Sequence, residues 1–118
     1  MLKVESASEM NALERAILEG IAANHDTPPL VKDQLRVVTV VDRQHSGGGT
    51  FLNLAVPADV PRSHPQNMEI SGPLVTIPEV PEGAVTVLFV RDGAVSFLEI
   101  ASVGDSWPET ISEFTLGM

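Results

Sequence analysis

The segment spanning residues 84–101 places the strongest constraint on how this chain can fold. An apolar run at residues 84–90 is followed by Arg-Asp-Gly at residues 91–93 and by a second, largely apolar run at residues 94–101. Asp-Gly favours a two-residue type I′ turn, in which both central residues take a positive φ. The segment therefore predicts an antiparallel hairpin that turns at residues 91–93.

A second hairpin and one short strand are predicted from the central part of the chain. Residues 35–43 are rich in β-branched residues and apolar on both faces through their middle, which is typical of an interior strand. A glycine-rich turn at residues 45–49 follows, and residues 50–56 form the returning strand. Prolines bracket residues 74–77, which favours a short strand at the edge of the sheet.

One helix is predicted near the N-terminus. Residues 6–9, Ser-Ala-Ser-Glu, have the form of a capping box with Ser6 as the N-cap. We expect the helix to cover residues 7–23, because Asn24 can end it and the prolines at 28 and 29 prevent its continuation. Apolar residues recur at helical spacing on one face of this segment, namely Met10, Leu13, Ile17 and Ile21.

Together these elements predict an α+β fold. We expect a single domain over residues 1–118, with one N-terminal helix packed on a four- to five-stranded, mainly antiparallel sheet built from two hairpins. The tail, residues 103–118, is expected to pack loosely over this domain. Both hairpins contain strands that are apolar on both faces, yet only one helix is available to cover a sheet. Uncovered apolar surface usually finds a partner, which predicts a homodimer through the sheet face or edge.

The charge of the chain is strongly acidic and unevenly distributed. The net charge is −9, and residues 68–118 hold Arg91 as their only cation against eight acidic residues. Such a surface repels phosphate backbones, so we expect no nucleic-acid partner. It can attract a basic protein partner, while the simpler interpretation is that the acidity keeps the protein soluble.

Cysteine content and apolar patterning bear on the compartment. The chain has no cysteine, which excludes disulfides and cysteine-ligated zinc and fits a reducing cytosol. The first residues lack the apolar core of a signal peptide, and no apolar run approaches the length of a membrane span. We therefore expect a cytoplasmic protein that does not enter a membrane.

The residue patterns that could carry catalysis or bind a cofactor are weak. The glycines at 47–49 precede a strand rather than a helix, so a flexible turn is favoured over a phosphate cradle. Asp42, His45 and Ser46 are the residue types of a hydrolase triad, but neighbours in one turn rarely aim at a common point. His25, His45 and His64 all fall in predicted loops without the spacing of metal ligands. We predict no catalytic residue, no cofactor and no metal site.

Glu99 is the single residue most suggestive of function, because it lies in an otherwise apolar strand. Alternation places it on one face with Phe97, where a carboxylate is expected to be partly buried. Arg36 or Arg43, on the other hairpin, could pair with it. The alternatives are an acid held in a pocket and an outward-facing residue at a solvated or edge position.

Trp107, the only tryptophan, stands before Pro108 in the acidic tail. It is interpreted either as a lid over the core or as an exposed anchor for a partner. The predicted ligand- or partner-binding residues are Glu99, Trp107, Arg36, Arg43 and His45.

Two segments carry a resemblance to a known set of proteins. Residues 47–57, GGGTFLNLAVP, and residues 87–108, with VLFVRDG, then Leu-Glu, then GDSWP, resemble segments of the forms GxGxFxxxxVP and LFVxDGxxxxLE…GxxWP. These recur in a family of small uncharacterised bacterial proteins, and the resemblance spans residues from about 10 to 116. It implies a bacterial, cytoplasmic, intact domain and favours a role for Glu99. The family has no established activity, so no catalytic residue is carried over.

The leading functional hypothesis is a non-enzymatic binding or interaction domain. One version is a small acidic protein that neutralises a basic partner, as immunity-type proteins do. The alternative is a small-molecule binder or minor enzyme with a pocket built around Glu99. A pocket containing Glu99 would favour the second hypothesis, and a flat acidic face would favour the first.

Overall fold

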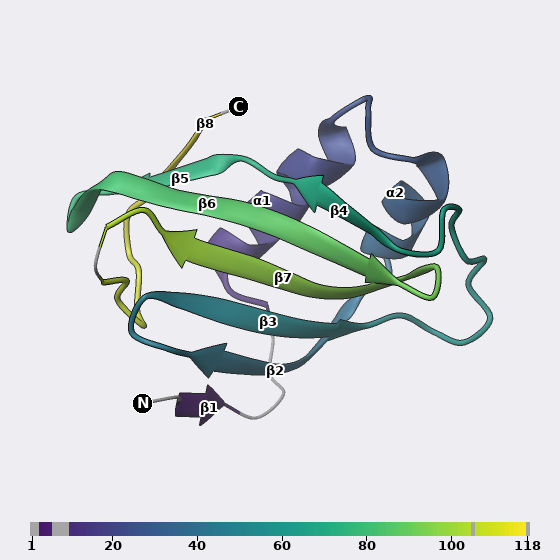
Figure 1. The fold of residues 1–118 in the computed structure, drawn as a ribbon, viewed down its shortest axis with the longest axis horizontal. Helices are drawn as coiled ribbons and strands as arrows, with labels where there is room; N and C mark the ends of the chain where they lie inside the picture. The colour runs from purple at the N-terminus through teal and green to yellow at the C-terminus, as the bar shows by residue number, and fades with distance from the viewer. Residues whose placement is uncertain (1–2, 6–9, 105, 118) are drawn as a thin grey trace.

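The chain folds into two layers, with helices packed on one face of a single antiparallel sheet (Figure 1). The computed structural model describes residues 3–5, 10–104 and 106–117. In chain order the elements are β1 (Lys3–Glu5), α1 (Ala12–Ala23), α2 (Pro29–Leu35), β2 (Thr39–His45), β3 (Gly49–Ala55), β4 (Met68–Ser71), β5 (Leu74–Ile77), β6 (Val80–Arg91), β7 (Ala94–Ser102) and β8 (Thr115–Gly117).

The sheet is larger than the sequence predicts. Its strand order is β1-β2-β3-β7-β6-β5-β8, and β4 pairs with β6 beyond the end of β5. Every pairing is antiparallel. The described residues thus contribute eight strands, and the prediction of four or five was wrong because β1, β4 and β8 are three or four residues long and depend on their neighbours for pairing.

The helical layer also differs from the prediction of one helix. Pro29 begins a second helix, α2. The amide hydrogen that proline lacks would have no acceptor within the helix at this first position, and the fixed φ of proline suits a helix. The prolines that were expected only to prevent continuation of α1 therefore start α2, and β2 begins at Thr39 rather than at residue 35. Val31 of α2 is fully buried.

Helix α1 ends at Ala23 as predicted but begins five residues later than predicted. Asn11 has an extended backbone and caps the helix, with its side chain accepting from the Glu14 amide while the Glu14 carboxylate accepts from the Asn11 amide. This is a capping box of the predicted kind at a different position. The predicted box at residues 6–9 lies outside the described residues. Of the predicted apolar face, Leu13, Ile17 and Ile21 are buried and Met10 is partly buried.

Both predicted hairpins form. Strands β6 and β7 meet at a turn in which Asp92 and Gly93 have φ values of 55° and 79°, as a type I′ turn requires. Strands β2 and β3 form the second hairpin. The strand at Leu74–Ile77 forms too, but the edge position predicted for it was wrong, because β8 pairs with its outer side.

The core lies between the sheet and α1. Side chains of Leu88, Leu98 and Ile100 are buried on the face of the sheet that α1 covers, together with those of the helix. Figure 1 views the opposite face, with α1 passing behind β6 and β7. No helix of the described part is both long and apolar enough to cross a membrane.

Candidate functional site

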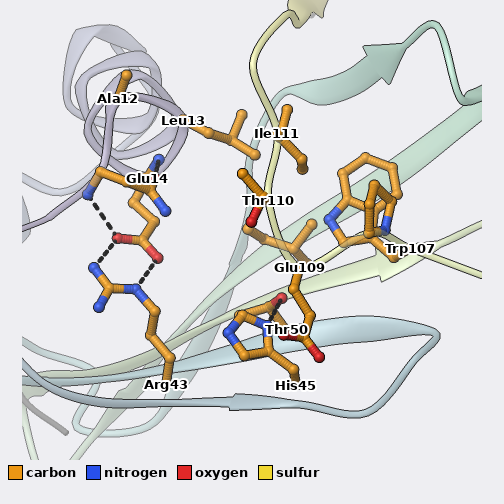
Figure 2. Close-up of a pocket in the computed structure, with 13 residues that line it drawn as sticks. Ala12, Leu13, Glu14, Arg43, His45, Thr50, Trp107, Glu109, Thr110 and Ile111 are labelled. Atoms are coloured by element: carbon orange, nitrogen blue, oxygen red, sulfur yellow. Dashed lines mark hydrogen bonds and ion pairs between the residues drawn. The ribbon is translucent and has the colours of Figure 1, made fainter. Parts of the chain in front are cut away.

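A pocket of about 320 Å³ lies where the start of α1, the β2–β3 hairpin and residues 107–111 meet (Figure 2). Its walls combine apolar side chains with several polar and charged ones. They are formed by Asn11, Ala12, Leu13, Glu14, Arg43, His45, Thr50, Ile100, Trp107, Pro108, Glu109, Thr110 and Ile111.

A buried ion pair forms one wall of this pocket. The Arg43 guanidinium donates from Nε to Glu14 Oε2 and from an Nη atom to Glu14 Oε1, each at 2.6 Å. The two side chains are 6% and 2% exposed. This bidentate geometry is the strongest form of a carboxylate–guanidinium contact, and it fixes α1 against β2.

A buried histidine stands beside the pair. His45 Nδ1 lies 3.1 Å from the Thr50 hydroxyl, which faces it directly across the β2–β3 ladder. Both residues are nearly inaccessible. The prediction that His45 lies in a loop was wrong, because β2 extends two residues further than expected and ends at His45. Arg43 and His45 therefore project into the pocket from the same strand face.

Trp107 closes the far side of the pocket. Its side chain is 5% exposed, and its amide donates a hydrogen bond of 2.6 Å to the carbonyl of Gly47 in the β2–β3 turn. Of the two interpretations drawn from the sequence, the lid over the core is the one seen in the structure. We call residues 107–111 the tail strap.

The structure brings three of the five predicted binding residues together and separates the other two. Arg43, His45 and Trp107 line the pocket. Arg36 lies at the end of α2, exposed, and contacts Asp33 at 3.4 Å. Glu99 does not line the pocket. The suggested pairing of Glu99 with Arg36 or Arg43 was wrong, because each arginine is engaged by another carboxylate.

Sequence reasoning missed two other residues of this pocket. Glu14 was not among the predicted binding residues, yet it is 2% exposed, because Arg43 neutralises it inside the domain. For Thr50 the sequence predicts only the first residue of a strand. The available signal was the capping position of Glu14 three residues after Asn11.

The triad-like residues are not assembled as a triad. Asp42 accepts a hydrogen bond from Asn53 Nδ2 at 2.5 Å, whereas His45 contacts Thr50. Within the part of the chain that the structure describes, no three histidine, aspartate or glutamate side chains are grouped as a metal ion would need.

A second candidate site is the face of the sheet that the helices leave open. Phe89 and Phe97 stack with centroids 4.3 Å apart and planes at 15°, and Phe51 meets Phe97 at 6.0 Å and 54°. Glu99 and Val87 continue this surface, since register pairs Glu99 with both Phe51 and Val87. We call the surface formed by Phe51, Val87, Phe89, Phe97 and Glu99 the aromatic face.

Glu99 is only half-buried there, and no hydrogen bond or ion pair joins it to any other described residue. Alternation along β7 correctly placed it with Phe97 rather than with the buried Leu98 and Ile100. Of the alternatives left open by the sequence, the structure therefore gives an outward-facing carboxylate on an apolar surface.

Comparison of this chain with protein-family models, with curated proteins and with solved structures found no match in any of the three. The resemblance to a family of small bacterial proteins accordingly stays a prediction.

Proposed function

We propose that this protein is a non-enzymatic interaction domain that binds another protein through the aromatic face. The observation that carries the proposal is the set of three touching phenylalanine rings on the side of the sheet opposite the helices. Aromatic side chains are enriched in the energetically important centres of protein interfaces. A contiguous apolar surface around a half-buried carboxylate is typical of such an interface rather than of an ordinary solvated sheet.

The position of Glu99 favours this function over the alternative of a pocket built around it. Glu99 lies between Phe51 and Val87 on an open surface, and the pocket beneath the tail strap does not include it. The acidic surface of the chain, with a net charge of −9, adds long-range attraction for partners of opposite charge.

Site-specific photo-crosslinking in cells that naturally express the chain tests this function. Val85 is 49% exposed and continues the aromatic face along β6, so a photoreactive phenylalanine analogue at Val85 would sit at the interface. The same analogue at Glu19, exposed on α1, serves as the control. We expect a discrete adduct from position 85 and none from position 19. Equal labelling from both positions, or none from position 85, would contradict the proposal.

A second candidate function is the binding of a small polar molecule beneath the tail strap. The observation that favours it is a pocket that joins a buried ion pair, a buried histidine and the indole of Trp107. Pockets of this size that combine apolar walls with a few polar groups are typical ligand sites.

Fluorescence of Trp107, the only tryptophan, reports directly on this pocket. Titration with amino acids, nucleosides and sugars is expected to change the emission for one class and to raise the melting temperature with it. Replacing Thr50 by valine should weaken that response without moving the strap. If no class changes either signal at millimolar concentration, the pocket is structural.

A further inference from the structure

The aromatic face already carries one guanidinium of its own. The Arg91 guanidinium carbon lies 5.1 Å from the centroid of the Phe89 ring, within the range of a cation–π contact. Phe89 stacks on Phe97, and Phe97 contacts Phe51. Three rings therefore run across β6, β7 and β3, with a cation of the chain itself at the Phe89 end.

The opposite end of the ring series has the complementary anion, Glu99. Phe51 and Glu99 are directly opposite each other in the β3–β7 ladder, so their side chains project from the same side of the sheet with Cβ atoms about 5 Å apart. Glu99 is half-buried and is joined to no other described residue by a hydrogen bond or ion pair. A ring and a carboxylate at this spacing offer two attractions to a planar cation.

We propose that the Phe51–Glu99 end of the aromatic face is the docking site for an arginine side chain of the protein partner. This inference rests on the interaction function proposed above and specifies the partner's chemistry. A guanidinium can donate two parallel hydrogen bonds to a carboxylate while its plane stacks on a ring, which a lysine ammonium cannot do. Arg91 on Phe89 shows that this surface accepts a guanidinium.

The charge of the chain supports a basic partner. Residues 68–118, which include β6 and β7, hold eight acidic residues against Arg91 alone. Glu69, directly opposite Phe89 in the β4–β6 ladder, adds a second acid at the rim of the face. An arginine-bearing partner would meet attraction both at the rim and at Glu99, whereas an acidic one would meet repulsion.

The test is an NMR titration of the intact protein at low ionic strength with a short peptide of alternating leucine and arginine. Versions of the same peptide with lysine or citrulline in place of arginine are titrated in parallel. We expect the arginine peptide to shift resonances of Phe51, Phe97 and Glu99. It should bind about threefold to fivefold more tightly than the lysine peptide, since the stacking term favours guanidinium. The citrulline peptide keeps the shape but not the charge, and it should bind most weakly.

Matched variants distinguish binding at this site from attraction to the acidic surface as a whole. Glu99→Gln should weaken binding of the arginine peptide by about tenfold and abolish the preference over lysine, because a charge-assisted hydrogen-bond pair is lost. Glu19→Gln removes the same charge from the exposed face of α1 and should change the affinity by less than about twofold. Phe51→Leu should reduce the arginine preference while leaving Glu99 in place.

Equal binding of the arginine and lysine peptides, or equal effects of Glu99→Gln and Glu19→Gln, would overturn the arginine site. Light scattering that showed a dimer disrupted by Glu99→Gln would also overturn it, since a second copy would then occupy the face. None of these three results contradicts the proposed interaction function, which fails only if position 85 gives no specific cross-link.

Discussion

The carboxylate of Glu14 serves two partners at once, the Arg43 guanidinium at 2.6 Å and the amide of Asn11 at 2.9 Å. It thereby joins the cap of α1 to β2, two elements separated by α2 in the sequence. A buried ion pair contributes little compared with apolar residues of the same size, but removing one member takes the bidentate partner away from a buried charge.

Removing one member of this pair should therefore be costly, and removing both should not. Glu14→Gln and Arg43→Met are each expected to lower the free energy of unfolding by about 3 to 5 kcal/mol. The double variant Glu14→Leu with Arg43→Met should recover most of that loss, apart from about 1 kcal/mol for the lost cap. Urea unfolding measures all three. A double variant whose loss equals the sum of the single losses would contradict this account.

Glu99→Gln should have little effect on the free energy of unfolding, in contrast to Glu14→Gln. Because Glu99 has no partner within the described residues, its replacement should change the free energy of unfolding by no more than about half a kcal/mol. Denaturant melts at pH 7, run beside those of Glu14→Gln, make the comparison within one chain. A loss of several kcal/mol would identify Glu99 as half of a structural ion pair instead.

Gln34 of α2 should prove to be a principal anchor of the β6–β7 turn. Its side chain is fully buried, donates to the carbonyls of Pro61 and Gly93, and accepts from the Val95 amide. Gln34→Leu removes the acceptor of the buried Val95 amide, while the Gly93 carbonyl keeps the Ser63 amide as its donor, and the change should cost about 1 to 3 kcal/mol. Thermal melts measure the loss, and faster hydrogen exchange at Val95 would locate it. Gln66→Leu, at an exposed position, is the control and should have little effect.

The fold could be predicted from the sequence where local chemistry decides it. The β6–β7 hairpin needed only Asp92-Gly93 and two apolar runs, and both features act within the segment itself. Helix α2 was missed because Pro28 and Pro29 were interpreted only as a stop to α1, whereas proline also suits the first positions of a helix. Strand β8 was missed because its three residues gain a strand conformation only by pairing with β5.

The sequence pointed to several residues of the candidate sites one at a time, but it did not show which of them come together. Arg43, His45 and Trp107 each attracted notice for its own chemistry, yet only the tertiary fold carries the tail strap back to the β2–β3 turn. Strand alternation placed Glu99 beside Phe97 correctly, because period 2 is a local property. The pairing predicted between Glu99 and Arg43 was wrong, because Arg43 forms its ion pair with Glu14 of α1.

Gly93 should tolerate no side chain, whereas Gly48 in the other hairpin should. Gly93 has a φ of 79°, and a Cβ added there would lie 2.7 Å from the Arg62 Cβ and 3.0 Å from the Ser63 carbonyl oxygen. Gly93→Ala therefore meets both backbone strain and a clash in a region already tied by the Ser63 amide to the Gly93 carbonyl.

We expect Gly93→Ala to lower the free energy of unfolding by about 2 to 4 kcal/mol. At Gly48 nothing lies within 4 Å of an added Cβ and the φ is not in the left-handed region, so Gly48→Ala should be neutral or stabilise by up to about 1 kcal/mol through the unfolded state. Urea unfolding of the two variants side by side measures the difference. Equal stability of the two would mean that the loop containing Arg62 and Ser63 can move away from the β6–β7 turn, and that the left-handed backbone at position 93 accepts alanine, both at no cost.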